Sequence, residues 1–358
     1  MGDIMQIEKV VELIKNTDEK CPIKMAYKSN HRYYSDFMSV LRRFKDVLSD
    51  KEFNELVSKF QFDKAYERHK YFEIVSEIII LDFVLRNYNQ EKKFKYEPKY
   101  NGGYNPECSF INKSKTINIE VKCPNLEKRL NSEDKDKMKI FLQDRLPNFK
   151  EIENDAINKC NPQIEDRNNS GVEVRKRLDN ALKSYLIHSQ KKFPSSGDTY
   201  FNILAISLRT VSDLDEWYSY IFGNEGVFTD NSFVSENYEN VDAILLTRSI
   251  YKHLEWDRYD DVDIWNLEDE INILLLNPKK ENSEIGEYYK QYGIDMFGES
   301  TRKFLSFQRN KDILLREKLR KSNLNNCYIE DLGKYIEELI GITYKIDESN
   351  IITEFINS

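Results

Sequence analysis

Two glutamates and a lysine lie at positions that predict a metal-binding site. They belong to the segment from 106 to 123, which reads PECSFINKSKTINIEVKC. This segment alternates between apolar and polar residues, as a strand with one buried face does, and the polar stretch Asn112 to Lys115 interrupts it. We therefore predict two antiparallel strands joined by a four-residue turn.

The turn fixes which residues of the two strands face each other. Directly opposed residues share one face of a sheet, so Cys108 should pair with Ile119 and Glu107 with Glu120. This register separates an apolar face from a polar face. The predicted apolar face consists of Cys108, Phe110, Ile117, Ile119, Val121 and Cys123, and the polar face of Glu107, Ser109, Asn118, Glu120 and Lys122.

Glu107 opposite Glu120 needs a compensating cation, because like charges opposed across a strand pair are destabilising. Mg²⁺ binds one or two carboxylates and keeps water or phosphate oxygens as its other ligands. Lys122 follows on the same face, where it can orient or deprotonate a metal-bound water and stabilise charge on a phosphate. Together these residues predict hydrolysis of a phosphodiester bond.

The lysine motif is weak by itself, because an acid, any residue and a lysine occur four more times in the chain. These copies begin at Asp18, Glu91, Glu97 and Glu133. Only Glu120-Val121-Lys122 lies in an alternating strand, with the pair Pro106-Glu107 on the neighbouring strand. The alternative interpretation is a solvated hairpin face that carries a cross-strand ion pair.

The spacing of apolar residues predicts the elements that position the hairpin. Residues 4 to 87 carry apolar side chains three and four apart, which predicts several amphipathic helices, the last from about Glu67 to Tyr88. A further helix is predicted from about Val172 to Phe193. Strands are predicted at 94–100, 106–111, 116–123, 200–208, 241–247 and 271–276.

This order predicts an α/β fold, with a mixed sheet flanked by helices. We expect an N-terminal helical region at 1–66, an α/β core at 67–280 and a C-terminal helical region at 281–358. The polar residues at about 125–170 predict an insertion in the core that holds one or two helices.

The residues that carry this pattern resemble the PD-(D/E)XK nuclease superfamily, which has the restriction-endonuclease-like fold. Its motif is Pro-Asp, a variable spacer, then Asp or Glu, any residue and Lys, on neighbouring strands. Pro106-Glu107 and Glu120-Val121-Lys122 match this motif, except that Glu107 stands where aspartate is usual. The family core, αβββαβ, has the order predicted above, and the resemblance covers roughly residues 67 to 210.

The resemblance implies a role for each matching residue. Glu107 and Glu120 would bind Mg²⁺, for which Mn²⁺ can substitute, together with the carbonyl of Val121. Lys122 would serve the attacking water. The family often adds a glutamate from the preceding helix, where Glu77 and Glu73 share one face.

We select Glu77 as the helix carboxylate and keep Glu73 as the alternate. Glu77 directly precedes the apolar run 78–81, so this part of the helix should lie near the sheet. The other interpretation is that both glutamates are solvated.

The charge of the chain limits where nucleic acid can bind. The 358 residues include 54 Lys and Arg against 62 Asp and Glu, a formal charge of −8, so any such surface must be a local patch. The segments Val172 to Lys192, with 6 basic and 2 acidic residues, and Arg302 to Lys321, with 8 and 2, predict two basic helices. They suit a groove that follows phosphates, although solvated basic faces explain them equally well.

Several classes of protein are excluded by what the sequence lacks. The five cysteines form no CxxC pair, and the chain has neither a GxxxxGK[ST] phosphate loop nor an apolar run of 18 residues. The first residues have no apolar core of a signal peptide. We therefore expect a cytoplasmic protein that makes no membrane contact.

The sequence predicts a Mg²⁺-dependent endonuclease that hydrolyses DNA. The resemblance suggests restriction or phage defence as its setting, and a homodimer would suit double-strand cleavage. Two alternatives stay open. One is a catalytically inactive module of the same fold that binds nucleic acid or assists assembly, and the other is a nuclease directed at RNA.

Overall fold

The computed structural model describes eight segments of the chain and four further residues. The segments are 7–88, 93–100, 105–125, 138–142, 172–176, 179–223, 226–229 and 238–297, and the single residues are 151, 154, 155 and 301.

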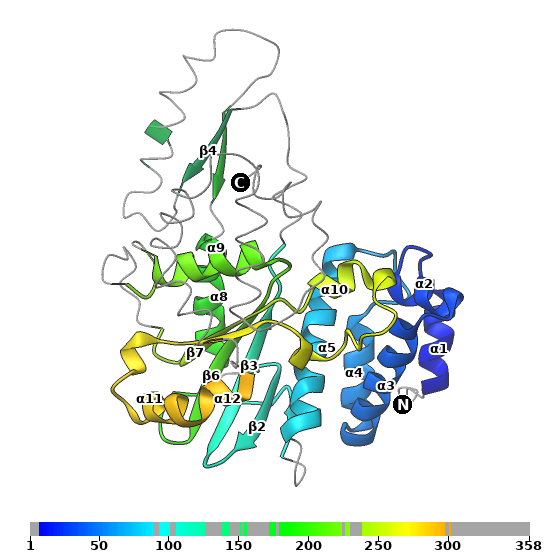
Figure 1. The fold of residues 1–358 in the computed structure, drawn as a ribbon, viewed down its shortest axis with the longest axis horizontal. Coiled ribbons are helices and arrows are strands. Elements are labelled where there is room, and N and C mark those ends of the chain that lie inside the picture. Colours follow the sequence, from blue (N-terminus) through cyan, green and yellow to red (C-terminus); the bar gives the residue numbers. More distant parts are fainter. Residues whose placement is uncertain are drawn as a thin grey trace, which may run out of the picture.

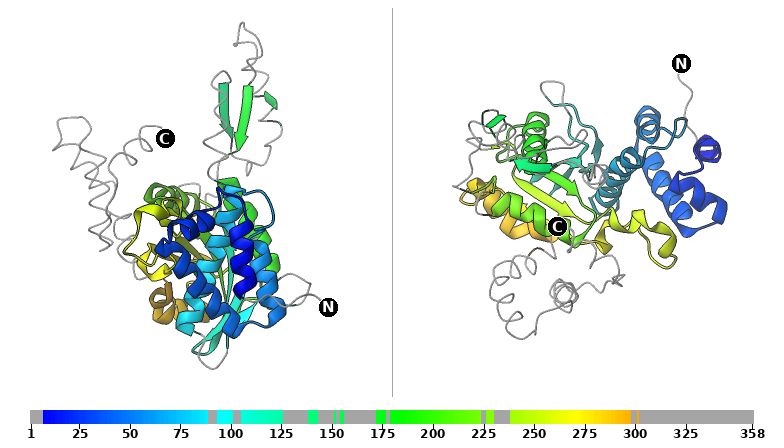
Figure 2. Two further views of the ribbon diagram at one scale, coloured as in Figure 1. Left: turned by 90° about the vertical axis from the view of Figure 1, so that its right-hand side faces the viewer. Right: turned by 90° about the horizontal axis from the view of Figure 1, so that it is seen from above.

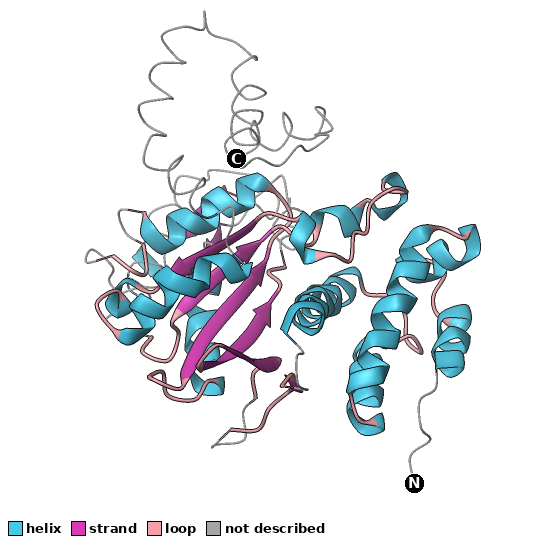
Figure 3. Ribbon diagram, turned by 60° about the horizontal axis from the view of Figure 1, so that its bottom comes forward, coloured by secondary structure: helices cyan, strands magenta, loops and turns pink. Residues whose placement is uncertain are grey.

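A six-stranded mixed sheet forms the centre of the protein (Figures 1 and 3). The strands lie in the order β1-β2-β3-β6-β7-β8. β1, β2 and β3 are antiparallel, β3, β6 and β7 are parallel, and β8 is antiparallel to β7. Their bounds are β1 Lys95–Tyr96, β2 Cys108–Asn112, β3 Lys115–Lys122, β6 Tyr200–Ser207, β7 Ala243–Thr247 and β8 Asn272–Leu276. The predicted mixed-sheet α/β fold is confirmed.

The hairpin has the register that the sequence predicts. Cys108 pairs with Ile119, and Asn112 pairs with Lys115 at the turn. Lys113 adopts a positive φ of 53° there, which lets the chain reverse within two residues. The end of the hairpin that carries Glu107 and Lys122 is therefore held at a fixed place relative to the turn.

Helices precede the sheet, as predicted. They are α1 Ile7–Asn16, α2 Pro22–Ser29, α3 Arg32–Val47, α4 Asp50–Lys59 and α5 Arg68–Tyr88. The start of α4 is fixed by a capping box, in which the side chain of Ser49 accepts from the Glu52 amide and the Glu52 carboxylate accepts from the Ser49 amide. α5 lies between the sheet and the earlier helices (Figures 2 and 3). Because both sides of α5 are covered, its apolar residues surround most of the helix.

The two faces of the sheet carry different helices. α5, α11 (Glu284–Tyr288) and α12 (Ile294–Phe297) share one apolar core with residues such as Phe110 and Ile119. α8 (Asp179–Lys192) and α9 (Val211–Phe222) share a second core with Leu204 and Ile206. The polar face of the hairpin is therefore covered too, and Asn118 and Glu120 are fully buried.

The predicted helix at 172–193 is wrong over its first residues. Val172–Lys176 forms a strand, β5, parallel to β4 at Met138–Leu142, and α8 begins only at Asp179. The alternation of Val172 and Val174 with polar residues is a strand pattern, which the basic composition of the segment obscured. β4 lies within the predicted insertion, and Figures 1 and 2 show this strand pair projecting from the main sheet.

The remaining elements are short. They are α10 Tyr251–Leu254, a π turn at Tyr289–Gly293, and 3₁₀ turns at Trp256–Arg258, Leu267–Asp269 and Pro278–Lys280. The second basic helix, predicted at Arg302 to Lys321, lies outside the described residues. In the part of the chain that the structure describes, no helix is both long enough and apolar enough to cross a bilayer. The domain boundaries at 66 and 280 stay predictions.

A buried carboxylate joins α3 to α5. Arg43 donates to both oxygens of Asp82, from Nε at 2.7 Å and Nη2 at 2.8 Å, and Arg86 Nε donates to Asp82 Oδ2 at 2.7 Å. The Asp82 side chain is 1% exposed, so removing it takes away the carboxylate that Arg43 contacts and leaves Arg86 with only Asp263 among the described residues, at 3.2 Å.

We expect Asp82→Ala to lower the free energy of unfolding by about 2–3 kcal/mol, somewhat less than for a fully buried pair, because both arginines are partly exposed. Urea unfolding measures this loss. Asp36→Ala is the control, since Asp36 makes a more exposed pair with Arg32 on the same helix, worth less than about 1 kcal/mol. Equal losses in the two variants would contradict the assignment.

A buried histidine joins α10 to the N-terminal helices. His253 Nδ1 lies 2.8 Å from the hydroxyl of Tyr33, and Trp265 packs edge-on against the His253 ring at 4.7 Å. Burial lowers the pKa of His253 to about 3, against a smaller opposing effect of a backbone hydrogen bond at Ile264. His253 therefore binds a proton near pH 6.5 in the unfolded chain but stays neutral at this pH in the folded chain.

Stability should consequently fall as the pH is lowered from about 6.5, by up to about 1.4 kcal/mol per pH unit from this residue. Asp242 acts in the opposite direction, because burial raises the pKa of its carboxyl to about 6. The test is thus the difference between wild type and His253→Phe in urea unfolding from pH 7 to pH 5. We expect the difference to shrink as the pH falls, whereas His188→Gln, at an exposed site on α8, should leave the profile unchanged.

Candidate active site

Four carboxylates gather at the end of the hairpin away from its turn. Glu107 directly precedes β2 and Glu120 lies near the end of β3, so the antiparallel register brings them together. Glu77 reaches the same place from α5, and Glu97 reaches it from the residue after β1. One oxygen each of Glu77, Glu97 and Glu107 lies within 4.8 Å of the other two.

Three lysines pair with these acids in two groups. Lys122 and Lys192 both contact Oε1 of Glu120, at 2.6 and 2.7 Å. Lys192 also lies 3.7 Å from Oε1 of Glu107. The other oxygen of Glu107, Oε2, lies 3.3 Å from Lys59. Glu107 therefore contacts both groups of lysines, with Lys192 near Oε1 and Lys59 near Oε2.

Lys59 forms the centre of the second group. Its Nζ lies 2.5 Å from Glu77 Oε1 and 2.7 Å from Glu97 Oε1, besides its contact with Glu107. Burial lowers the pKa of Lys59, but the charges of Glu77 and Glu107 outweigh it, and the net pKa lies above the ordinary value. An ammonium ion thus stands among three carboxylates.

Glu120 is the most deeply buried of the acids. Its side chain is 0% exposed, and its Oε2 has no hydrogen-bond partner among the described residues. Burial raises the pKa of Glu120, and the neighbouring charge of Glu107 raises it further. A buried acceptor without a donor is costly, and a divalent cation would satisfy it. A set of carboxylate oxygens is also the donor set that Mg²⁺ prefers, so these residues fit the implied metal.

The structure separates the two candidate helix carboxylates. Glu77 is buried beside Glu107, and burial, followed by the charge of Glu107, raises the pKa of Glu77 to about 8 against the effect of Lys59. Glu73 is 48% exposed and pairs instead with His69, at 3.2 Å. Glu77 therefore belongs to the cluster and Glu73 does not.

The structure brings together four of the predicted site residues, Glu107, Glu120, Lys122 and Glu77. The role of the Val121 carbonyl as a metal ligand stays a prediction. Val121 pairs with Ala205 of β6 in the parallel ladder. Sequence reasoning misses Glu97, Lys59 and Lys192. Glu97 belongs to one of the motif copies that lack strand context, and Lys192 lies in the predicted basic helix. Lys59 carries no local signal, because only the packing of α4 beside α5 brings it here.

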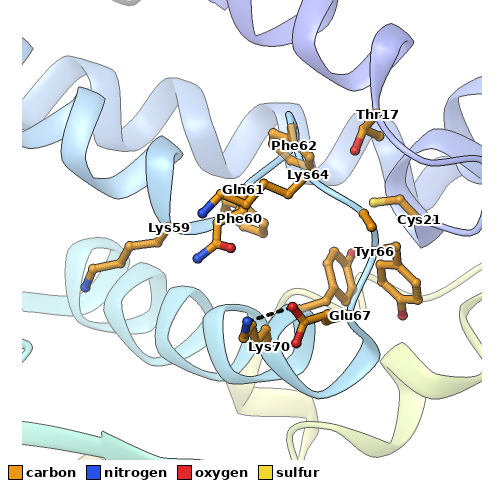
Figure 4. Close-up of a pocket in the computed structure, with 12 residues that line it drawn as sticks. Thr17, Cys21, Lys59, Phe60, Gln61, Phe62, Lys64, Tyr66, Glu67 and Lys70 are labelled. Atoms are coloured by element: carbon orange, nitrogen blue, oxygen red, sulfur yellow. Dashed lines mark hydrogen bonds and ion pairs between the residues drawn. The ribbon is translucent and has the colours of Figure 1, made fainter.

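Lys59 also lines a small cavity. It has a volume of about 20 Å³, which holds one water molecule, and its lining includes Cys21, Phe60 and Tyr71. In Figure 4 the side chain of Lys59 extends away from the other lining residues. The cavity is too small for a nucleotide.

A scan of protein-family models, a search of curated proteins and a search of solved structures each return no match for this chain. We therefore base the functional assignment on the residues of the cluster and their geometry. The arrangement can bind a divalent cation and can place two ammonium groups, of Lys122 and Lys192, beside it.

Manganese binding should depend on Glu107, because this residue links the two groups of the cluster. At a Mn²⁺ concentration one hundred times its Kd, the wild-type free energy of unfolding should rise by about 2.7 kcal/mol. In Glu107→Gln the rise should be much smaller, because the neutral amide is a poorer ligand for the ion than the carboxylate. Thermal unfolding with and without Mn²⁺ measures both effects.

Glu73→Gln is the matched control, since Glu73 lies on the same helix as Glu77 but outside the cluster. It should keep the full response to Mn²⁺. If Mn²⁺ stabilised Glu107→Gln as much as wild type, the cluster would not be the binding site.

Proposed function

We propose that this protein is a Mg²⁺-dependent endonuclease that hydrolyses phosphodiester bonds of DNA. The observation that carries the proposal is the buried Oε2 of Glu120, which lacks a hydrogen-bond partner within the described part of the chain, with the ammonium group of Lys122 on the other oxygen of the same carboxylate. A divalent cation would satisfy this oxygen, and Lys122 would place a general acid or base group at the edge of the site.

The order of elements supports a restriction-endonuclease-like core. α5, β1, β2, β3, α8 and β6 follow one another in the αβββαβ order of that family, with β4 and β5 inserted before α8. The places of the residues that match the motif also support it: Glu107 directly precedes β2, Glu120 and Lys122 lie in β3, and Glu77 lies in α5. A homodimer and a setting in restriction or phage defence are further implications of this resemblance.

The residues of the site would have different roles in hydrolysis. Glu107 and Glu120, with Glu77, would hold Mg²⁺, which supplies Lewis acidity and lowers the pKa of a bound water. Lys122 is about one-quarter exposed, so its ammonium group lies where the buried acids meet solvent. It would orient the attacking water and attract a phosphate oxygen.

Lys192 adds a second ammonium group at the same boundary. It is the last residue of α8, is about one-quarter exposed, and shares Glu120 Oε1 with Lys122. The basic end of α8 would thus guide the DNA backbone toward the site through contacts with its phosphates.

A second candidate is an inactive module in which the cluster is a structural hub. Each of the four acids has a lysine within 3.3 Å, and the ion pairs of the cluster link α4, α5 and α8 to the hairpin. In that case the protein would bind nucleic acid without cutting it.

We expect Lys122→Ala to reduce Mg²⁺-dependent cleavage of DNA about 10²–10⁴-fold, the range for loss of a general acid or base. Binding to the same DNA in Ca²⁺ should change little, because one phosphate contact is lost. Gel assays of plasmid and labelled oligonucleotide cleavage, with fluorescence anisotropy for binding, make both measurements. Lys95→Ala, at an exposed site in β1, is the control and should cleave normally.

The same assay separates the alternatives. Binding without cleavage by the wild-type protein, in any of Mg²⁺, Mn²⁺ or Co²⁺, would support the inactive module. RNA of matched sequence, cleaved in preference to DNA, would identify an RNA-directed nuclease.

A further inference from the structure

Lys59 stands where a metal ion would stand. Its ammonium nitrogen contacts Glu77, Glu97 and Glu107 at 2.5, 2.7 and 3.3 Å. The oxygens of these acids lie within 4.8 Å of one another, and two oxygens on opposite sides of a Mg²⁺ or Ca²⁺ ion lie about 4–5 Å apart, at twice the metal–oxygen distance. The three carboxylates thus have a spacing suited to one cation, and an ammonium group fills it.

Charge and space prevent the ammonium group and a metal ion from sharing this position. Four carboxylates and three lysines leave the whole cluster with a formal charge of −1. A divalent ion added to this set would make the charge +1, whereas the same ion in place of Lys59 would make it 0. Coulomb repulsion over less than about 3 Å therefore favours exchange over addition.

A second observation indicates that the cluster attracts positive charge beyond its lysines. Glu120 Oε2 is buried and has no partner among the described residues, although Lys122 and Lys192 both contact the other oxygen.

We propose that Glu77, Glu97 and Glu107 form a divalent-cation position that Lys59 occupies until the cation displaces it. This inference rests on the proposed function, since Glu77 and Glu107 belong to both sets of ligands, and it adds Glu97 as a ligand and Lys59 as a competitor. The N-terminal helices thereby take part in the site, because Lys59 is the last residue of α4.

The surroundings of Lys59 allow it to leave. Its side chain is about one-quarter exposed, and α4 ends at this residue. The next residues turn away from the helix, with Gln61 at a positive φ of 49°.

Lys59→Met should bind Mn²⁺ more tightly than wild type. If Lys59 occupies the position nine-tenths of the time, its removal raises the apparent affinity about tenfold. Isothermal titration calorimetry with MnCl₂ and full-length protein, without nucleic acid, measures this change. Lys64→Met, at an exposed position in the loop after α4, is the control and should bind as wild type does.

Adding Glu97→Gln to Lys59→Met should return the affinity to the wild-type level or below, because Glu97 contributes to this position only. Unchanged Mn²⁺ affinity in Lys59→Met, or a gain that survives Glu97→Gln, would overturn the proposal. Lys59→Gln keeps a donor for one carboxylate and replaces the methionine variant if that variant does not fold.

The wild-type protein offers a test that needs no variant. Acetylation of Lys59 by sulfo-NHS-acetate, followed by mass spectrometry, should increase severalfold when Mn²⁺ is added, because the displaced ammonium group becomes accessible. Acetylation of Lys64 serves as the reference. Unchanged or reduced labelling of Lys59 would count against displacement.

These results separate the proposal from the proposed function. Displacement of Lys59 by Mn²⁺ without cleavage of any nucleic acid would support the cation position and contradict the endonuclease. Mg²⁺-dependent cleavage with Lys59 still protected would support the endonuclease and contradict the competitor.

Discussion

The opposition of Glu107 and Glu120 at the open end of the hairpin is the constraint on which the rest of the site depends. The register leaves these acids no other arrangement, since Cys108 and Ile119 are fixed partners beside them. Like charges so placed must be balanced by cations. The chain supplies lysines from α4, from β3 and from the end of α8, and each of these elements must be held in place for the balance to work.

This requirement explains why α5 is covered on both sides. Glu77 can be kept beside Glu107 only if α5 lies against the sheet, and Lys59 can reach both only if α4 packs on α5 from outside. The two-sided burial of α5 meets both conditions, and the Asp82 network fixes α3 against the same helix. Residues that stabilise the fold thus also position the charges of the site, as a preorganised site requires.

Much of this arrangement could be predicted from local sequence patterns, whereas the rest depends on long-range packing. The alternation in 106–123 was sufficient for the register, and the apolar run after Glu77 distinguished it from Glu73. Lys59 and Glu97 could not be predicted, because their place depends on how α4 and β1 pack around α5 and the hairpin. The copy of the lysine motif that begins at Glu97 does not lie in an alternating strand pattern, yet Glu97 belongs to the cluster.

The burial of the acids also bears on what the cluster is for. Replacing a buried ion pair by apolar residues of similar volume is often neutral or stabilising, so stability alone is a weak reason to keep one. Here burial raises the pKa of both Glu77 and Glu120, and one oxygen of Glu120 lacks a partner among the described residues. A hub built only for stability would gain from apolar side chains at these positions. Carboxylates whose charge is only partly balanced are instead what a divalent cation needs, and this favours a catalytic role over a structural one.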